Sequence, residues 1–394
     1  MQNKKTFALG MLLGMAIMLG VSFGIGPVRS HVVWGRHMPP DAKVLEIYRV
    51  LESYSIVPIN RDVLLDSMYQ GMLEGVGDPY TYYFNREALA VFLERNAGSY
   101  AGVGMVVTMD LEDNKVTVVT VFSGSPAEEA GLLPGDKLIW VDGEDMIGKR
   151  VDEVTSRVRG IPGSTVRLRV LRGEETINVM LTRQQIYIPT VSHRMLDGDI
   201  GLLRIESFDQ ITITQFSEAY IDLRNQGMRG MIIDLRNNPG GSLDTVVHIS
   251  NLLLPEGVIL YTEDSRGNRR YYRSQSGNRI DEPLVILVNG GSASASEVLT
   301  GAVRDHGVGT VVGQQTFGKG VVQSLITLSD GSAVKVTTSR YYTPNGISIH
   351  GEGIRPDFIV EVDRETAMMS ARLELEDDIQ LQKAISVMEN KLEN

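Results

Sequence analysis

The chain has 394 residues, of which 42% are hydrophobic and 22% charged, so it is long enough for more than one domain and has an ordinary globular composition. Its formal net charge is −11 and it contains no dense Lys/Arg stripe, which argues against nucleic acid as a partner. Cysteine is absent and the six histidines are scattered, so we expect no disulfide framework, no zinc site, no other metal and no cofactor.

An apolar segment follows Lys4 and Lys5 near the start of the chain. It covers residues 7–28, which is about the 20 residues that a helix needs to cross a bilayer. We assign residues 1–30 as a signal peptide or membrane anchor, and favour an uncleaved anchor because the small residues at the candidate cleavage site form a poor signal. The protein is then expected to be extracytoplasmic, anchored to the cytoplasmic membrane and facing the periplasm or the exterior. A buried core helix is the alternative.

Apolar residues recur at helical spacing between residues 41 and 93, which predicts a helical N-terminal region at residues 38–98. Its last part contains the run GVGDPYTYYF, in which Asp78 and Pro79 break the helix. Three tyrosines gather in this run, and we interpret them as a wedge in the core rather than as a docking surface.

Short β-rich runs replace the helical pattern over residues 99–184, with glycines and prolines between them. The expected strands are residues 104–109, 115–121, 137–141, 165–171 and 176–181. One helix is expected at residues 150–158. Together these elements predict a compact β domain with one clear helix.

After Pro189, strands alternate with helices as in an α/β layer. The expected strands are 200–205, 230–235 and 284–288, and the expected helices are 213–226 and 294–305. The continuous apolar runs MIIDL and PLVILV suit strands that are buried on both faces. A hairpin is expected at residues 321–339. We place this α/β core at residues 185–362, and interpret the tail at residues 363–394 as a solvated, charged amphipathic helix.

The run SYAGVGMVV, residues 99–107, opens the β domain just before a strand. Glycines at such a place let backbone N–H groups converge on an anion, and the neighbouring strand edge can accept an extended peptide. Together with the run GSPAEEAGLLPGDKLIWVDG, it resembles the PDZ domains of bacteria, which implies binding of free protein C-termini. The loop residues are Gly102, Val103, Gly104 and Met105. Arg159 is a candidate for holding the peptide carboxylate or for coupling its binding to the rest of the chain; a surface arginine is the alternative.

The turn RNNPGG, residues 236–241, lies between a buried strand and a helical segment that begins near Ser242. Its glycines, Gly240 and Gly241, would expose backbone N–H groups at a helix entrance. Such donors are what an oxyanion hole requires, because they stabilise the charge that develops on a carbonyl oxygen during acyl transfer. A purely structural turn is the alternative, and this motif alone does not decide between the two.

The motif NGGSASASE, residues 289–297, lies between a second buried strand and a helix. A serine at such a turn has an exposed hydroxyl near the positive end of the helix dipole. Ser292, Ser294 and Ser296 compete for this role, and each could instead cap the helix. Spacing alone does not choose among them.

A serine needs a base to act as a nucleophile. His306 lies at the far end of the same predicted helix, about 18 Å along the axis from Ser294, and is out of reach. Lys319, in the glycine-rich run TFGKG, is the remaining candidate, because desolvation there would lower its pKa and let the amine accept the serine proton. Taken alone, such a lysine is more often simply exposed or a phosphate ligand, although no Walker pattern is present.

The motifs LRNNPGG, NGGSASASE, DHG and TFGKGVVQ occur in the order and spacing of the carboxyl-terminal processing proteases, also called tail-specific proteases. The resemblance covers residues 75–360, including YYTPNGISIHGEGIRPD, in which His350 stands where we expect glutamine. It implies Ser294 as the nucleophile, Lys319 as its base 25 residues later, and Gln323 as the residue that orients the lysine. The implied oxyanion donors are the backbone of Ala295 and that of Gly240 or Gly241.

The resemblance also implies an α/β and β multi-domain fold, in which the PDZ-like domain at residues 99–184 is inserted between the helical N-terminal region and an α/β serine protease core. It implies a serine endopeptidase that captures protein C-terminal tails in the PDZ groove and cleaves through an acyl-enzyme. The expected partners are proteins or peptides with free C-termini, with an activating adaptor and a homo-oligomer as further candidates. The alternative is a noncatalytic PDZ scaffold; a chaperone-like His-Asp-Ser protease is disfavoured because no histidine precedes a GNSGG-like serine motif.

Overall fold

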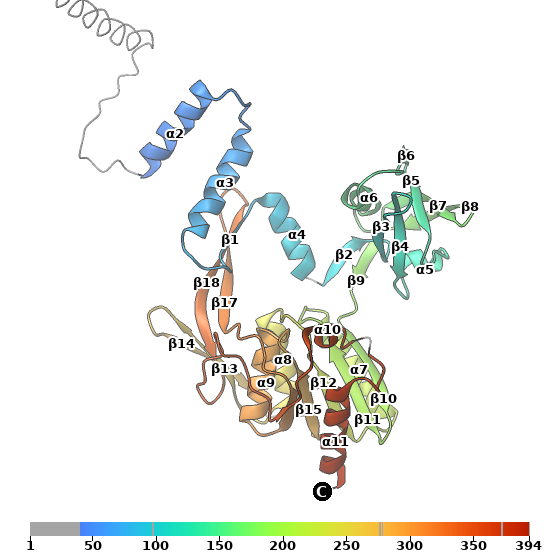
Figure 1. Cartoon of the computed structure of the whole chain (residues 1–394), viewed down its shortest axis with the longest axis vertical. Helices are drawn as coiled ribbons and strands as arrows, with labels where there is room; N and C mark the ends of the chain where they lie inside the picture. The colour runs from blue at the N-terminus through green and yellow to red at the C-terminus, as the bar shows by residue number, and fades with distance from the viewer. Residues whose placement is uncertain (1–39, 97, 276, 278, 372, 394) are drawn as a thin grey trace, which may run out of the picture. The chain divides into compact units, whose positions relative to one another are not determined.

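The computed structural model describes residues 40–96, 98–275, 277, 279–371 and 373–393 (Figure 1). The predicted signal peptide or anchor at residues 1–30 therefore lies outside the described residues. Among the residues that are described, no helix has both the length and the apolar character that crossing a membrane requires. The chain divides into two compact units between Ser67 and Met68.

The first unit contains α2 (Pro40–Tyr54) and the start of α3 (Arg61–Glu74). Asn60 caps α3, since its side-chain oxygen accepts hydrogen bonds from two N–H groups of the first turn. The helices that the apolar spacing predicts are thus present. Many of the apolar side chains of α2 are exposed, including Ile47, which is 52% exposed.

The tyrosine-rich run continues into β1 (Tyr82–Phe84), which pairs antiparallel with β18 (Ala333–Tyr342). Tyr83 and Phe84 are buried, whereas Tyr82 is 46% exposed. Of the three tyrosines, the interpretation as a core wedge is therefore confirmed for Tyr83 and wrong for Tyr82, while Tyr80 is only partly buried.

An antiparallel sheet of order β3-β4-β5-β7-β8 follows, and the two strands β2 and β9 pair with each other at its entry and exit. The elements are β2 (Ser99–Gly102), β3 (Met105–Asp110), β4 (Lys115–Val121), α5 (Pro126–Glu129), β5 (Lys137–Val141), β6 (Glu144–Asp145), α6 (Val151–Val158), β7 (Thr165–Arg172), β8 (Glu175–Thr182) and β9 (Gln184–Tyr187). Val154 and Val158 of α6 close a separate hydrophobic core over this sheet. The five predicted strands and the predicted helix are all observed here.

The α/β core is a six-stranded sheet of order β10-β11-β12-β15-β16-β19, parallel throughout except for β10. Its elements are β10 (Val191–Leu196), β11 (Ile200–Ile205), α7 (Thr212–Asn225), β12 (Gly230–Asp234), α8 (Leu243–Leu253), β15 (Leu284–Val288), α9 (Ala295–Asp305), β16 (Gly309–Gly313) and β19 (Phe358–Ile359). The strands β12 and β15 are buried along their whole length, as their apolar runs predict. Because β12 and β15 are parallel neighbours, the RNNPGG and NGGSASASE turns that follow them lie at the same edge of the sheet.

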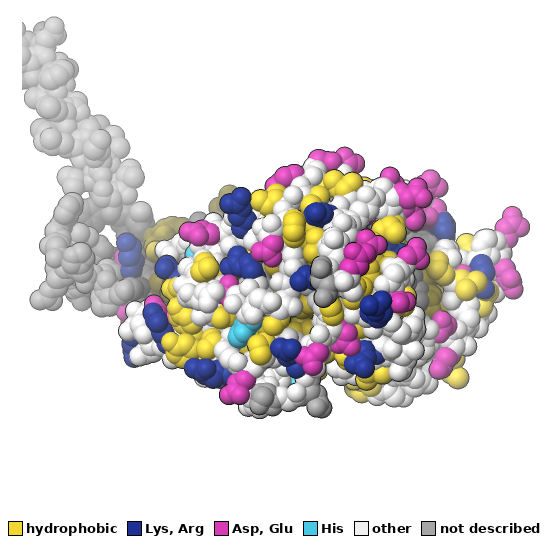
Figure 2. All heavy atoms as spheres, turned by 90° about the horizontal axis from the view of Figure 1, so that it is seen from below, with side chains coloured by type: hydrophobic (Ala, Val, Ile, Leu, Met, Phe, Trp, Pro, Cys, Tyr) yellow, Lys and Arg dark blue, Asp and Glu magenta, His cyan; other side chains and the backbone are white. Residues whose placement is uncertain are grey.

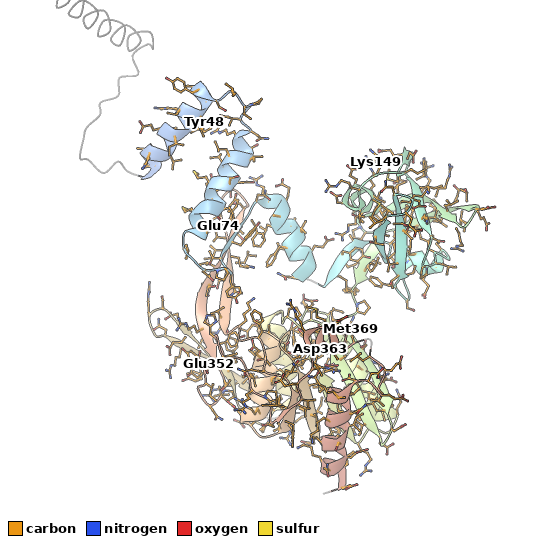
Figure 3. The ribbon with its side chains drawn as sticks, viewed as in Figure 1. Tyr48, Glu74, Lys149, Glu352, Asp363 and Met369 are labelled. Carbon is orange, nitrogen blue, oxygen red and sulfur yellow. The ribbon has the colours of Figure 1, made fainter. Side chains whose placement is uncertain are left out.

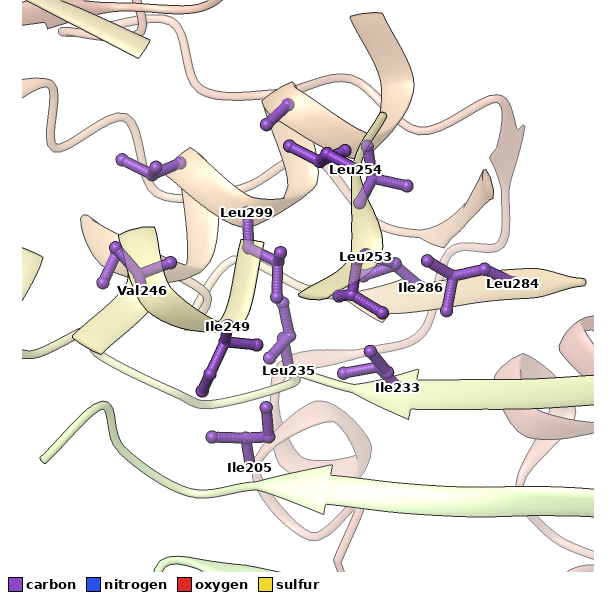
Figure 4. Packing of buried hydrophobic residues seen from close by; sticks show 14 of the residues in the cluster. Ile205, Ile233, Leu235, Val246, Ile249, Leu253, Leu254, Leu284, Ile286 and Leu299 are labelled. Carbon is purple, nitrogen blue, oxygen red and sulfur yellow. The ribbon is translucent and has the colours of Figure 1, made fainter. Parts of the chain in front are cut away.

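Helices α7, α8 and α9 contribute to the large hydrophobic core on one face of this sheet. In Figure 4, Ile249 of α8 and Leu299 of α9 belong to one cluster with the strand residues Ile205 and Ile286. Alternate strand residues point to the opposite face, which also requires a cover because a parallel sheet is buried on both sides.

The C-terminal helix α11 (Ile379–Glu393) supplies that cover. Its buried side chains, which pack with residues of β11, β12, β15 and β16, are Leu381, Ala384, Val387 and Met388. Before it comes the short helix α10 (Arg364–Met368), whose two flanking residues, Asp363 and Met369, are labelled in Figure 3. The interpretation of the tail as a solvated surface helix is therefore wrong. The sequence shows an apolar stripe but not the open sheet face that receives it.

Another sheet, separate from the three described above, has the order β1-β18-β13-β14, with β17 beside β18. Its remaining strands are β13 (Gly257–Asp264), β14 (Arg269–Ser274) and β17 (Val321–Thr327). The predicted hairpin is formed by β17 and β18, which pair from Val321 opposite Arg340 to Thr327 opposite Ala333. Lys319 lies just before β17, so this sheet brings it toward the turns of the α/β core.

One face of the molecule is shown in Figure 2 with its side chains coloured by type. Lys/Arg and Asp/Glu side chains are interspersed there among hydrophobic ones. The charge on this face is therefore mixed rather than gathered into one patch.

Candidate active site

The structure distinguishes the three serines of the NGGSASASE motif. Ser292 and Ser296 are fully buried, and their hydroxyls donate to backbone carbonyls at 2.7 and 3.0 Å. Ser294 is partly exposed and stands directly before the first residue of α9. The environment of the side chains thus favours Ser294 as the reactive hydroxyl, a choice that spacing did not make.

Ser294 has an unusual backbone conformation, with φ 54° and ψ −112°. A residue with a side chain in such a region costs about 1–3 kcal/mol and persists only where its surroundings impose it. Here the N–H of Ser294 donates to Glu297 Oε2 at 2.8 Å. A serine held on a sharp strand-to-helix turn, with its hydroxyl outward, is the geometry of a nucleophile elbow.

Glu297 is a fully buried carboxylate that connects the two candidate segments. Its Oε1 accepts the Thr316 hydroxyl at 2.6 Å and the Gly318 N–H at 2.7 Å. Its Oε2 accepts the N–H of Lys319 at 2.9 Å in addition to that of Ser294. One carboxylate therefore fixes the backbones of Ser294 and Lys319 relative to each other. Sequence reasoning missed Glu297, although its position three residues after a helix-capping serine is a capping-box signal.

Lys319 is partly buried, and its Nζ lies 4.7 Å from the centroid of the Tyr80 ring. Burial lowers the pKa of Lys319 below its ordinary value of 10.5, and the positive charge of Lys335 lowers it further, against the opposing effect of nearby carboxylates. Between the described side chains of Ser294 and Lys319 there is no direct hydrogen bond. Proton transfer would require the lysine side chain to turn from Tyr80 toward the hydroxyl, as is common when a catalytic bond tightens only with substrate bound.

Tyr341 of β18 is a second residue that sequence reasoning did not single out. Its hydroxyl donates to the carbonyl oxygen of Lys319 and contacts the Ser294 hydroxyl. Burial raises the pKa of Tyr341 well above its ordinary value, so this hydroxyl keeps its proton. Tyr341 therefore links the two candidate residues from the sheet side, as Glu297 does from the helix side.

The RNNPGG turn lies against Ser294. A Cβ on Gly240 would be 2.8 Å from Ser294 Cβ and 2.9 Å from the nitrogen of Ala295. The N–H of Gly240 already donates to Asn238 Oδ1 at 2.8 Å. Within the described part of the chain the Gly241 N–H has no such bond, and the N–H of Ala295 is the first of α9, where helical N–H groups lack intrahelical acceptors. Of the expected oxyanion donors among the described residues, Gly241 and Ala295 therefore have N–H groups without such a bond, whereas the N–H of Gly240 is already used.

A cavity of about 220 Å³ opens beside Ser294. Its walls include the apolar side chains of Leu243, Val298 and Val322, so it suits an apolar substrate side chain. Gln323 also lines it, and its Nε2 donates to a backbone carbonyl at 3.3 Å. No hydrogen bond from Gln323 to the Lys319 side chain is present between these two described residues, so the expected orienting contact is not formed in this conformation.

His306 stays at the far end of α9, where its Nε2 is 2.8 Å from the carbonyl oxygen of Val258. This agrees with its exclusion as the base. In the described ranges, no group of three or more His, Asp or Glu side chains is arranged to hold a metal ion.

The PDZ-like sheet has a groove of about 310 Å³ between β3 and α6. Among the described strands, β3 pairs only with β4, so its other edge is open to an extended peptide. Four of the five residues expected to bind the peptide line this groove, namely Gly102, Val103, Met105 and Arg159. The fifth, Gly104, shapes the loop with a φ of 85°.

Arg159 stands at the C-cap of α6. Its Nη1 donates to Glu94 of α4 (Arg86–Asn96) at 2.6 Å, and its guanidinium lies 4.9 Å from the centroid of the Tyr100 ring. In this conformation Arg159 is thus paired with a carboxylate of the protein's own N-terminal region while it lines the groove.

We expect Gly104→Ala to destabilise the PDZ-like domain and abolish its binding of C-terminal peptides. The added Cβ would lie 2.6 Å from Ser125 Oγ, and the residue would keep a positive φ. The matched control is Gly124→Ala, which has a φ of 70° but open space around its Cβ, so it carries only the backbone strain of about 1–2 kcal/mol. Thermal melting and titration with a fluorescent peptide check this; equal effects of the two variants would contradict the steric argument.

These features suit an α/β protease with a PDZ domain. Residues 199–360 match the family model "Peptidase family S41", and residues 102–182 match the model "PDZ domain". The chain is 35% identical over 343 residues to the carboxyl-terminal-processing protease of Synechocystis sp., which covers 86% of this chain and 80% of that protein. This protein belongs to the carboxyl-terminal processing protease family.

A probable CtpA-like serine protease of Staphylococcus aureus is 35% identical over 325 residues, covering 82% of this chain and 65% of that protein. Among solved structures, the photosystem II D1 C-terminal processing protease is 35% identical, with 80% of this chain and 86% of that chain covered and a TM-score of 0.48. The 65% coverage of the staphylococcal relative means that this chain spans slightly less than two thirds of its length.

Proposed function

We propose that this protein is a serine endopeptidase that binds the C-terminal tail of a protein in its PDZ groove and cleaves the chain with Ser294 as nucleophile and Lys319 as base. The observation that carries the proposal is the bridge made by Glu297, which binds the N–H groups of both residues beside a cavity. The names of the relatives support a C-terminal processing activity.

The proposed reaction begins when the neutral Lys319 amine takes the proton of the Ser294 hydroxyl, and the oxygen attacks the scissile carbonyl. The N–H groups of Gly241 and Ala295 would stabilise the oxyanion of the tetrahedral intermediate. Lys319 would then give its proton to the leaving amine, which leaves an acyl-enzyme on Ser294. Attack by water, with Lys319 again as base, would release the product and restore the serine.

Two side chains have proposed supporting roles. Gln323 would orient the Lys319 amine once it turns toward Ser294, since it lines the cavity at that side. Arg159 would exchange its partner Glu94 for the carboxylate of a bound tail, because both carboxylates offer the same bidentate geometry to a guanidinium.

We also propose that residues 1–30 anchor the protein to the extracytoplasmic side of the cytoplasmic membrane. The apolar run after Lys4 and Lys5 supports this.

The exposed apolar side chains of α2 support contact with a further protein chain, either a second copy or an activating adaptor.

The test uses an unstructured protein that ends in an apolar tail, with a matched substrate whose tail ends in two aspartates. We expect the apolar-tailed protein to be degraded at least about 10-fold faster at low concentration, because a lost apolar contact in the groove is worth about 1–3 kcal/mol. A free peptide that copies the tail should compete. Equal degradation of the two substrates would contradict tail recognition, and binding without cleavage would favour the noncatalytic scaffold.

A further inference from the structure

A buried charge network lies at the start of the RNNPGG turn. Arg236 is only 2% exposed and is held by two carboxylates. Its Nε and Nη2 donate to Asp234 at 3.0 and 2.8 Å, and its Nη1 and Nη2 donate to Asp378 at 2.7 and 2.8 Å. Arg236 is thus clamped from both sides, and its donors form bidentate pairs, which are the geometrically most specific kind.

Asp378 belongs to a distant part of the chain, 142 residues after Arg236. It stands just before α11, where its Oδ1 also accepts the N–H of Leu381 at 3.0 Å. Its side chain is 4% exposed, so its charge is compensated by protein groups rather than by water. The anchoring of α11 on the sheet therefore fixes where this carboxylate lies.

The residues next to Arg236 shape the candidate oxyanion turn. Asn238 Nδ2 donates to the carbonyl of Ile205 at 2.8 Å, while its Oδ1 accepts the N–H of Gly240. Asn237 has a φ of 60°, and its Nδ2 donates to the carbonyl of Ala367 at 2.7 Å and to Ser370 Oγ at 3.1 Å. The segment around α10 and α11 thus holds this turn at two points, through Asp378 and through Ala367 with Ser370.

We propose that Asp378 is a positioning residue for the reaction: acting through Arg236, it sets the place of the turn that presents the Gly241 N–H to the reacting carbonyl. This inference rests on the proposed Ser294 chemistry. A buried arginine that loses one of its two carboxylates keeps a charge that is only partly compensated, and the surroundings shift to relieve it. A displacement of about 1 Å in such a donor costs about 10²-fold in rate.

The experiment compares Asp378→Asn with Asp377→Asn in the full-length protein. Asparagine preserves the shape of Asp378, and Asp377 is an exposed neighbour that undergoes the same charge change. For a short chromogenic peptide, we expect Asp378→Asn to lower kcat by about 10- to 100-fold with KM little changed, and Asp377→Asn to match the wild type. Active-site titration with a fluorophosphonate corrects for any inactive fraction.

A peptide boronate forms a tetrahedral adduct with the serine. Its affinity is a measurement that a purely structural role of Asp378 would leave unchanged. Its affinity should fall in Asp378→Asn in parallel with kcat/KM. An unchanged affinity and an unchanged kcat per active site would overturn the inference, whatever the loss in melting temperature. Ser370→Ala is a milder variant that should weaken boronate binding in the same direction. Ser294→Ala keeps the two proposals apart: activity retained there would refute the proposed chemistry, whereas activity lost there but unchanged in Asp378→Asn would refute only the positioning role of Asp378.

Discussion

Ser294→Ala is expected to reduce kcat for a peptide substrate by about 10⁴-fold or more, because removing the nucleophile leaves only the contribution of binding and of the oxyanion donors. The loss should appear in kcat and not in peptide affinity, since the PDZ groove has its own sheet and its own core. Stopped-assay kinetics and a peptide-binding titration on the same preparation measure the two quantities separately.

Ser296→Ala is the matched control. It removes a hydroxyl from the same motif, but that hydroxyl is buried and donates to the carbonyl of Asn238 at 3.0 Å. We expect a loss of about 1 kcal/mol in the free energy of unfolding with activity largely kept. The opposite result, with Ser294→Ala active and Ser296→Ala inactive, would contradict the assignment of Ser294 as the nucleophile.

Lys319→Met is expected to cause a loss of similar size, because without a base the Ser294 hydroxyl stays protonated and is a weak nucleophile. Methionine keeps an unbranched apolar side chain but removes the amine that lies over the Tyr80 ring. Residues that act as a unit are not additive, so the double variant with Ser294→Ala should be no less active than either single variant. Additive losses in this cycle would contradict a Ser-Lys dyad.

Lys335→Met is the control for Lys319, and it adds a pH test. Lys319 acts as a base only when neutral, so kcat/KM should rise with pH up to the Lys319 pKa and level off above it. The midpoint of this rise in kcat/KM should lie below pH 10.5, since burial and the charge of Lys335 both lower the pKa of Lys319. Removing the charge of Lys335 raises the Lys319 pKa and should shift the rise to higher pH with the plateau unchanged. A shift to lower pH would mean that another group controls the profile.

The regular elements were largely predictable from the sequence. The strands of the PDZ-like sheet and the buried strands β12 and β15 follow from apolar runs and from the glycines between them, because periodicity and turn residues act over a few neighbouring positions. The tail was predicted as a helix for the same reason. Its burial could not be predicted, since the face that α11 covers is made of β11, β12, β15 and β16, strands that lie far from it in the chain.

The candidate site was likewise predictable from the sequence only in part. The sequence by itself supplied the motifs, and with them Lys319 and the glycine turn as candidates, because each depends on residue types at fixed short spacings. Only the family resemblance singled out Ser294 among three serines. Only the tertiary structure showed which of the three serines is partly exposed, and which groups hold the site together. Tyr341 and Asp378 act through hydrogen bonds to residues far from them in the chain, and such contacts leave no local pattern to read. For Glu297 the capping position is local, but its bond to the N–H of Lys319 is not.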